Sequence, residues 1–217
     1  MKTKLYVGMI ETPSRLAELG LEEEWLIHAV QHGQAAWANC TPNHPPLYRG
    51  ISAWAETISA LREALLPKAW RRSDNGNLPL TINELGTIAI IVSTGDEATG
   101  KRDGIPSTKS SKGPRTADAV TINAAQASLF EIRLRPEDLE DQRGMMTWIL
   151  LFHRDVETHE VRCELSRPIE MNADGYVDGW AERIVLNSIP LGSDSVKIPT
   201  GNAPQTPSIN IEVKKRA

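Results

Sequence analysis

The chain has 217 residues, 40% hydrophobic and 24% charged, which is the composition of a globular protein with one good core. Its formal net charge of −4 argues against a protein whose whole surface binds nucleic acid, although it allows a local basic segment. Two cysteines argue against a disulfide framework, and the apolar runs fall far short of the roughly 18 residues that span a membrane. We therefore expect a cytoplasmic protein without a membrane partner.

The N-terminal third predicts three helices. A short one is expected between Thr12 and Gly20, with threonine and proline at its start and glycine at its end. The second is expected over residues 21–39. The third, over residues 51–66, has the clearest apolar stripe at helical spacing: Ile51, Trp54, Ala55, Ile58, Leu61, Leu65 and Leu66. The last two helices predict a hairpin whose apolar faces need cover.

The rest of the chain predicts mostly strands. Residues 78–83 and 87–93 indicate a β-hairpin. Further strands are expected at 129–134, 147–153, 159–165 and 180–186, with a short helix opening at Pro136. Short turns between strands favour an antiparallel sheet without regular crossover helices. The predicted fold is α+β: an N-terminal helical hairpin on a mainly antiparallel sheet, in one domain over residues 1–190. Residues 191–217 are expected to be a Pro/Gly-rich tail ending in a basic edge strand at 209–216.

A long segment after the apolar 87–93 run, residues 95–118, is rich in Gly, Ser, Thr and Lys. It contains Gly95-x-x-x-x-Gly100-Lys101, most of a phosphate-binding signature, but Arg102 replaces the Ser or Thr that would bind Mg²⁺. A nucleoside triphosphatase is therefore not expected. The segment is expected to be a flexible, basic contact loop on an acidic protein, able to bind phosphate backbones or an acidic partner. The alternative is a solvated, mobile loop without a contact function. Its cationic residues are Lys101, Arg102, Lys109, Lys112 and Arg115.

Two alternative metal sites can be assembled. His28, His32, Cys40 and His44 have side chains that bind zinc, but convergence across Pro42 is not assured. Asp194 and Glu212-x-Lys214 resemble the Mg²⁺ site of restriction-type nucleases, in which the lysine assists hydrolysis. The ordinary alternatives are a core histidine for the first set and a charged edge strand for the second.

Three groups of segments carry a resemblance. They are PNHPPLYRG at 42–50 running into AWA at 53–55; TGDEATG at 94–100 with PSTK at 106–109 and KGP at 112–114; and ELS at 164–166 with GWAER at 179–183. Together they resemble uncharacterised bacterial proteins found near restriction or phage-defence genes. The resemblance implies a component of a multi-protein system acting on nucleic acid, and it assigns no activity and no catalytic residue.

These observations predict a non-catalytic accessory subunit of a bacterial nucleic-acid-processing or anti-phage assembly, with no cofactor. Its expected partners are larger subunits of the same system, and nucleic acid through the 95–118 loop. The alternative is a metal-dependent nuclease that uses Asp194, Glu212 and Lys214. A third possibility is a small binding module stabilised by zinc.

Overall fold

The computed structural model describes residues 2–131 and 144–191. In chain order the elements are β1 (Lys4–Tyr6), α1 (Glu11–Glu18), α2 (Glu23–Ala38), α3 (Tyr48–Leu65), a 3-10 turn (Leu66–Lys68), β2 (Arg71–Ser73), a second 3-10 turn (Asn75–Asn77), β3 (Leu80–Ile82), β4 (Ile88–Thr94), α4 (Pro114–Glu131), β5 (Met146–Asp155), β6 (Glu160–Met171), β7 (Val177–Val185) and β8 (Ile189–Pro190). The three predicted N-terminal helices are confirmed, with boundaries displaced by up to three residues.

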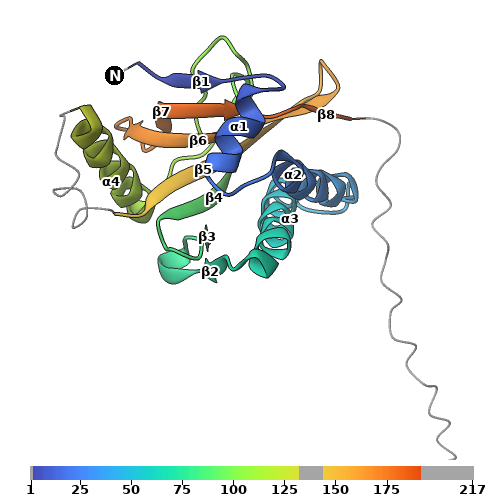
Figure 1. The fold of residues 1–217 in the computed structure, drawn as a ribbon. Coiled ribbons are helices and arrows are strands. Elements are labelled where there is room, and N and C mark those ends of the chain that lie inside the picture. The colour runs from blue at the N-terminus through green and yellow to red at the C-terminus, as the bar shows by residue number, and fades with distance from the viewer. Residues whose placement is uncertain (1, 132–143, 192–217) are drawn as a thin grey trace, which may run out of the picture.

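All the strands of the described residues belong to one mixed sheet (Figure 1). Their order is β1-β7-β6-β5-β4-β3-β2, and β8 pairs with β6. The β3–β4 hairpin is antiparallel, as predicted. The pairings β2–β3, β5–β6, β6–β7 and β6–β8 are also antiparallel, whereas β1–β7 and β4–β5 are parallel. The prediction of an α+β fold on a mainly antiparallel sheet is therefore confirmed.

The crossover from β4 to β5 corrects the sequence analysis. These two strands are parallel, and α4 lies between them in the chain, although no crossover helix was expected. The predicted strand at 129–134 is wrong where it is described, because residues 129–131 belong to α4. The remainder of that strand, the helix at Pro136 and the basic tail strand lie outside the described residues. Pro114 at the first helical position was the available signal for α4.

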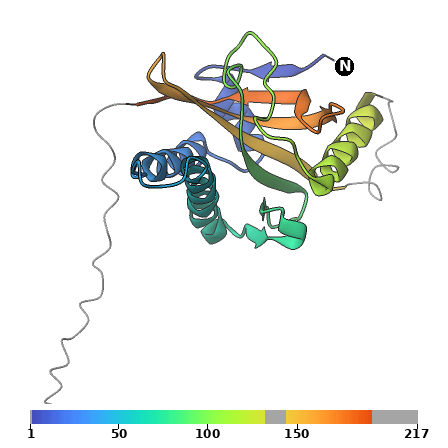
Figure 2. The ribbon, with the colours of Figure 1, turned by 180° about the vertical axis from the view of Figure 1, so that it is seen from behind.

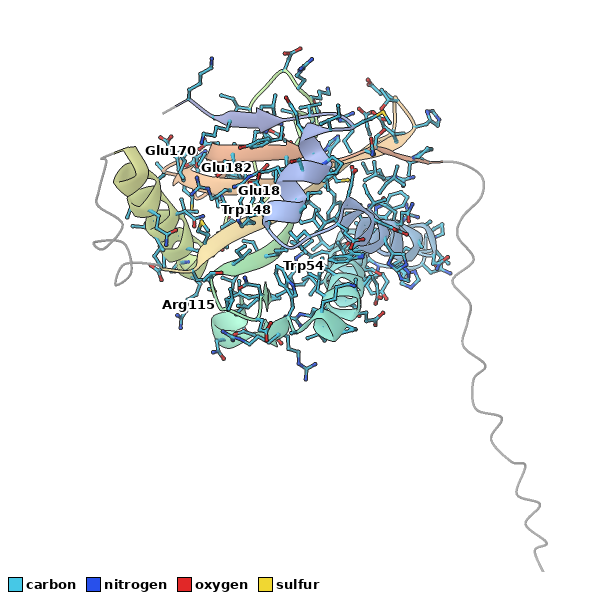
Figure 3. The ribbon with its side chains drawn as sticks, in the orientation of Figure 1. Glu18, Trp54, Arg115, Trp148, Glu170 and Glu182 are labelled. Atoms are coloured by element: carbon cyan, nitrogen blue, oxygen red, sulfur yellow. The ribbon has the colours of Figure 1, made fainter. Side chains whose placement is uncertain are left out.

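Helices cover the two faces of the sheet separately, as Figures 1 and 2 show from opposite sides. Alternate residues of β4 and β5 point to opposite faces. Ile90 and Leu150 pack in the core beneath α1, α2 and α3, whereas Ile91 and Ile149 pack against Val120 of α4. Trp148 (Figure 3) is fully buried on the first of these faces. The guanidinium of Arg15 in α1 lies 5.9 Å from the centroid of its ring. The face under α4 is also covered by the 95–113 segment.

The helical hairpin depends on a close approach between α2 and α3. Gly33 of α2 faces α3 so closely that a β-carbon there would lie 2.0 Å from Thr57 Oγ1 and 2.5 Å from the Ala53 carbonyl oxygen. Such separations are shorter than any real contact, so only glycine fits without movement of α3. No helix among residues 2–131 and 144–191 has the length and apolar character required to cross a bilayer.

Candidate anion-binding site

The segment that links β4 to α4 is held against the sheet along its length. The Asp96 amide bonds to the Ser107 carbonyl, and the Lys109 amide bonds back to the Thr94 carbonyl at the end of β4. Trp180 of β7 donates its indole N–H to the Pro106 carbonyl at 2.7 Å. The expectation that residues 95–113 are flexible is therefore not supported. The segment is a folded cover whose backbone has fixed partners.

A buried ion pair fixes this cover from below. Glu164 of β6 has no solvent exposure and accepts two bonds from Arg183 of β7, at 3.0 and 2.6 Å. Its carboxylate also accepts the Gly100 amide at 2.8 Å. Arg183 in turn donates to the carbonyls of Lys101 and Gly104. Both partners are thus hydrogen-bonded beyond their mutual contact, as a buried ion pair requires if it is not to destabilise the fold.

Gly100 is required at the point where the cover touches β6. Its φ is +71°, in the left-handed region, and a β-carbon would lie 2.7 Å from Cβ of Arg162. Arg162 reaches the same turn from β6 and donates to the carbonyls of Thr99 and Glu97 at 3.0 and 2.9 Å. The glycine of the apparent phosphate-binding signature therefore serves contact with the sheet.

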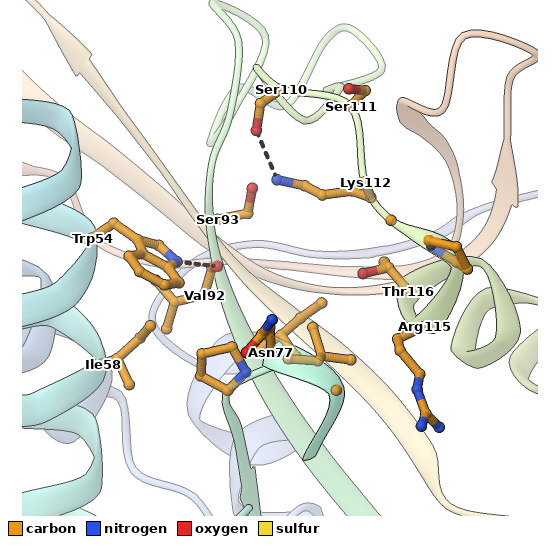
Figure 4. A pocket seen from close by; sticks show the side chains of 16 residues that line it. Trp54, Ile58, Asn77, Val92, Ser93, Ser110, Ser111, Lys112, Arg115 and Thr116 are labelled. Atoms are coloured by element: carbon orange, nitrogen blue, oxygen red, sulfur yellow. Dashed lines mark hydrogen bonds between the residues drawn. The ribbon is translucent and has the colours of Figure 1, made fainter. Parts of the chain in front are cut away.

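The cover ends at a cavity of about 360 Å³ at the start of α4 (Figure 4). Trp54 and Ile58 of α3 form one wall, and the Trp54 indole N–H donates to the Val92 carbonyl at 3.0 Å, which fixes the ring. Apolar residues of the 78–79 segment and β4 extend this wall. The volume lies at the lower end of the range of small-molecule pockets in proteins.

The opposite wall of the cavity is polar and cationic. It contains the hydroxyls of Ser93, Ser110, Ser111 and Thr116, together with Lys112 and Arg115. Arg115 lies against the 75–77 turn, where a β-carbon on Gly76 would be 2.8 Å from its Nε. The first turn of the 18-residue helix α4 adds the positive end of a helix dipole. The two walls divide the cavity into an aromatic side and an anion-attracting side.

Lys112 is the central charge of the cationic wall. Its ammonium donates to Ser110 Oγ at 3.0 Å (Figure 4), and among the described residues it forms no ion pair with a carboxylate. Burial lowers the pKa of Lys112 to about 8. The described lining of the cavity contains no Asp or Glu, although the chain has 28 acidic residues. The charge of Lys112 would therefore attract an anion into the cavity, and no carboxylate in the described lining would repel that anion.

The structure separates the five basic residues that the sequence analysis grouped. Lys112 and Arg115 line this cavity, and Lys109 lines a neighbouring one. Lys101 and Arg102 are exposed on the cover and line neither cavity. The sequence analysis did not find Trp54, Ser93 or the 75–79 turn as site residues. Their side of the cavity is brought to α4 by tertiary packing alone, and no local motif marks it.

The zinc site proposed from His28, His32, Cys40 and His44 receives no geometric support in the described residues. Among residues 2–131 and 144–191 no three His, Cys, Asp or Glu side chains are arranged to hold a metal ion. His28 and His32 lie ring to ring at 4.4 Å. The Cys40 thiol instead donates to the Ala36 carbonyl, and His44 stacks on Tyr48. The nuclease candidates Asp194, Glu212 and Lys214 lie outside the described residues.

Comparisons of the chain with protein-family models, with curated proteins and with solved structures found no match. The geometry of the cavity is therefore the basis for a functional assignment.

Proposed function

We propose that this protein is a non-catalytic subunit that binds a nucleic acid strand and holds one of its nucleotides in the cavity at the start of α4. The observation that carries the proposal is the half-buried Lys112 ammonium, which lacks a carboxylate partner in the described chain. The wider role, within a bacterial nucleic-acid-processing or anti-phage assembly, rests on the resemblance of three groups of segments to proteins encoded near such genes.

The physical argument starts from the cost of burying Lys112. A charged amine that has lost part of its hydration destabilises the folded protein unless a negative group compensates it. A phosphate between Lys112 and the first turn of α4 would supply that compensation, together with hydrogen bonds from the serine hydroxyls. Without a bound anion, we expect the folded protein to be less stable than a variant with an apolar residue in place of Lys112.

The opposite wall favours a nucleotide over an inorganic anion. An inorganic anion needs no aromatic surface, whereas a base can stack on an indole ring and a sugar can contact aliphatic side chains. Trp54 is half-buried at the cavity, and Ile58 and Val92 continue the apolar surface beside it. The cavity therefore combines a surface for the base with a cationic surface for its phosphate.

Replacing Lys112 by methionine tests the proposal. Fluorescence anisotropy with a labelled ten-nucleotide oligothymidylate at low salt should show affinity at least about tenfold lower, because a desolvated charge contact is lost. The slope of the logarithm of the affinity against the logarithm of the salt concentration should become smaller by the amount expected for about one phosphate contact. Thermal unfolding should show the variant at least as stable as the wild type, since it no longer buries an unpaired charge.

Lys4→Met is the matched control for Lys112→Met. Lys4 lies exposed on β1, and its loss removes the same charge far from the cavity. It should change the affinity by less than about twofold. Equal affinities of the Lys112 variant and the wild type would refute the proposed site.

The pH dependence of binding gives an independent prediction. Lys112 is charged below its pKa of about 8 and becomes neutral above it. The phosphodiester of the ligand stays anionic over this range. The affinity should therefore fall by about tenfold between about pH 7 and 9 in the wild type, as the protonated fraction of a group with that pKa does. In Lys112→Met the affinity should be lower and independent of pH, and a similar pH dependence in both proteins would contradict the assignment.

A further inference from the structure

A second cavity, of about 220 Å³, adjoins the first along α3 and the end of β4. At three places in the chain, one residue lines the first cavity and the residue next to it lines the second. Trp54, Ser93 and Ser110 line the first cavity, whereas their chain neighbours Ala53, Thr94 and Lys109 line the second. Since neighbouring Cα atoms are about 3.8 Å apart, the linings of the two cavities adjoin at three separate points of the chain. A ligand that extends beyond the first cavity could therefore contact the lining of the second.

The second cavity is also cationic. Two guanidinium groups share the ring of Trp37, with Arg154 at 3.9 Å and Arg49 at 4.9 Å from its centroid. Lys109 and His153 also line this cavity. The described lining contains no Asp or Glu, and no described carboxylate forms an ion pair with Arg49, Lys109 or Arg154. Lys109 and Arg154 therefore line one small volume without a carboxylate in its described lining, and Arg49 lies beside it on the ring of Trp37.

Arg154 is the residue whose bonding is least complete. Its Nη1 donates to Gln34 Oε1 at 3.3 Å, whereas its buried Nε has no hydrogen-bond partner among the described atoms. Burial and the nearby charge of Arg49 lower the pKa of Arg154. A guanidinium normally directs its N–H groups to a carboxylate or phosphate in a fork. Here Trp37 and Gln34 hold the guanidinium in place, but neither supplies an anion.

We propose that the second cavity is a phosphate subsite built on Arg154, Arg49 and Lys109, and that the two cavities together bind consecutive nucleotides of one single-stranded nucleic acid. The inference rests on the proposed function of the first cavity and names its substrate class. A single strand is favoured because placing a base against Trp54 requires that base to be unpaired and unstacked. A duplex keeps its bases paired, so only its backbone could reach these cavities.

The test compares ligands that fill one or both subsites, measured by isothermal titration calorimetry. The probes are thymidine monophosphate and a four-nucleotide oligothymidylate. In the wild type the longer ligand should bind at least about tenfold more tightly, because its second phosphate binds at high effective concentration. Arg154→Gln should abolish that gain and leave the affinity for the monophosphate within about twofold. The matched control Arg71→Gln, on exposed β2, should keep the gain.

Arg154→Lys separates charge from packing. Because it retains the cation it should keep part of the gain, although it lacks the planar group that lies on Trp37. If the lysine and glutamine variants lose the gain equally, Arg154 acts through packing and the second subsite is refuted. Unchanged binding of the four-nucleotide ligand by Arg154→Gln also refutes it.

A hairpin duplex with a ten-base-pair stem, compared with the ten-nucleotide oligothymidylate, tests the choice of substrate, because four separate base pairs do not form a stable duplex. Binding of the duplex as tightly as the single strand would overturn the single-strand assignment. Lys112→Met distinguishes the two proposals: if it leaves binding of both probes unchanged, the first site fails. If it weakens both while Arg154→Gln weakens neither, the second subsite alone fails.

Discussion

Replacing Glu164 by alanine is expected to lower the free energy of unfolding by about 3–5 kcal/mol, among the largest effects of any single substitution in the described chain. The reason is that Arg183, only 4% exposed, would keep its charge without a buried counter-charge. The Gly100 amide would also lose its acceptor beneath the cover. Urea denaturation followed by circular dichroism measures the difference.

Two further variants make this prediction decisive. Glu164→Gln keeps the shape and an acceptor oxygen but removes the charge, so it should be less destabilising than alanine and still fold. Glu18→Ala is the matched control, because Glu18 (Figure 3) also pairs with an arginine, Arg15. The Glu18 side chain, however, is 62% exposed. Its loss should change the free energy of unfolding by no more than about 1 kcal/mol. Similar effects at positions 164 and 18 would contradict a buried, structurally required pair.

Gly33→Ala is expected to destabilise the protein by about 1–3 kcal/mol, although alanine is the better helix former. The added methyl would meet Thr57 Oγ1 at 2.0 Å and the Ala53 carbonyl oxygen at 2.5 Å, so α2 and α3 must move apart or Thr57 must give up its hydrogen bond to Ala53. Ile58 and Leu61 on α3 belong to the main core, so such a movement would loosen packing against the sheet. The same urea titration measures the loss.

Gly50→Ala is the control for Gly33→Ala: it adds the same methyl group, but we expect it to stabilise the protein. Gly50 is exposed in α3, and a β-carbon there would have no heavy atom within 4 Å. It should stabilise the protein by up to about 1 kcal/mol through helix propensity alone. A stabilised or unchanged Gly33→Ala would mean that the two helices do not approach as closely as described.

The helices and strands that could be predicted have a local pattern. The apolar stripe at 51–66 recurs at the helical period, and the run at 87–93 is continuously apolar because β4 is buried on both faces. Helix α4 lacks such a stripe, since it presents polar Asn123 and Gln126 to backbone carbonyls near β5 alongside Val120. Because α4 has no periodic apolar pattern, the sequence analysis predicted neither this helix nor the parallel pairing of β4 and β5.

The candidate site was predictable only as a concentration of charge. The sequence indicates a basic segment at 95–118 on an acidic protein, and it contains Lys109, Lys112 and Arg115. The sequence of this segment does not indicate which of the three side chains loses its hydration. The burial of Lys112 depends on the 175–176 turn and on α3, which are far away in the chain. The Lys112 amide, for example, is held by the Gly175 carbonyl at 2.8 Å.

The sequence by itself determined the α+β class, the helical hairpin and the position of the basic segment, because each depends on residues close together in the chain. Only the tertiary structure decided that the polar side of β6 is covered. Arg162 and Glu164 alternate with apolar residues, as in a strand with one face in water, yet the 95–113 cover buries them. It also decided that Trp54 and Lys112 line one cavity. The physical reason is that hydrogen bonding and desolvation between distant segments do not produce a periodic pattern of residues in either segment.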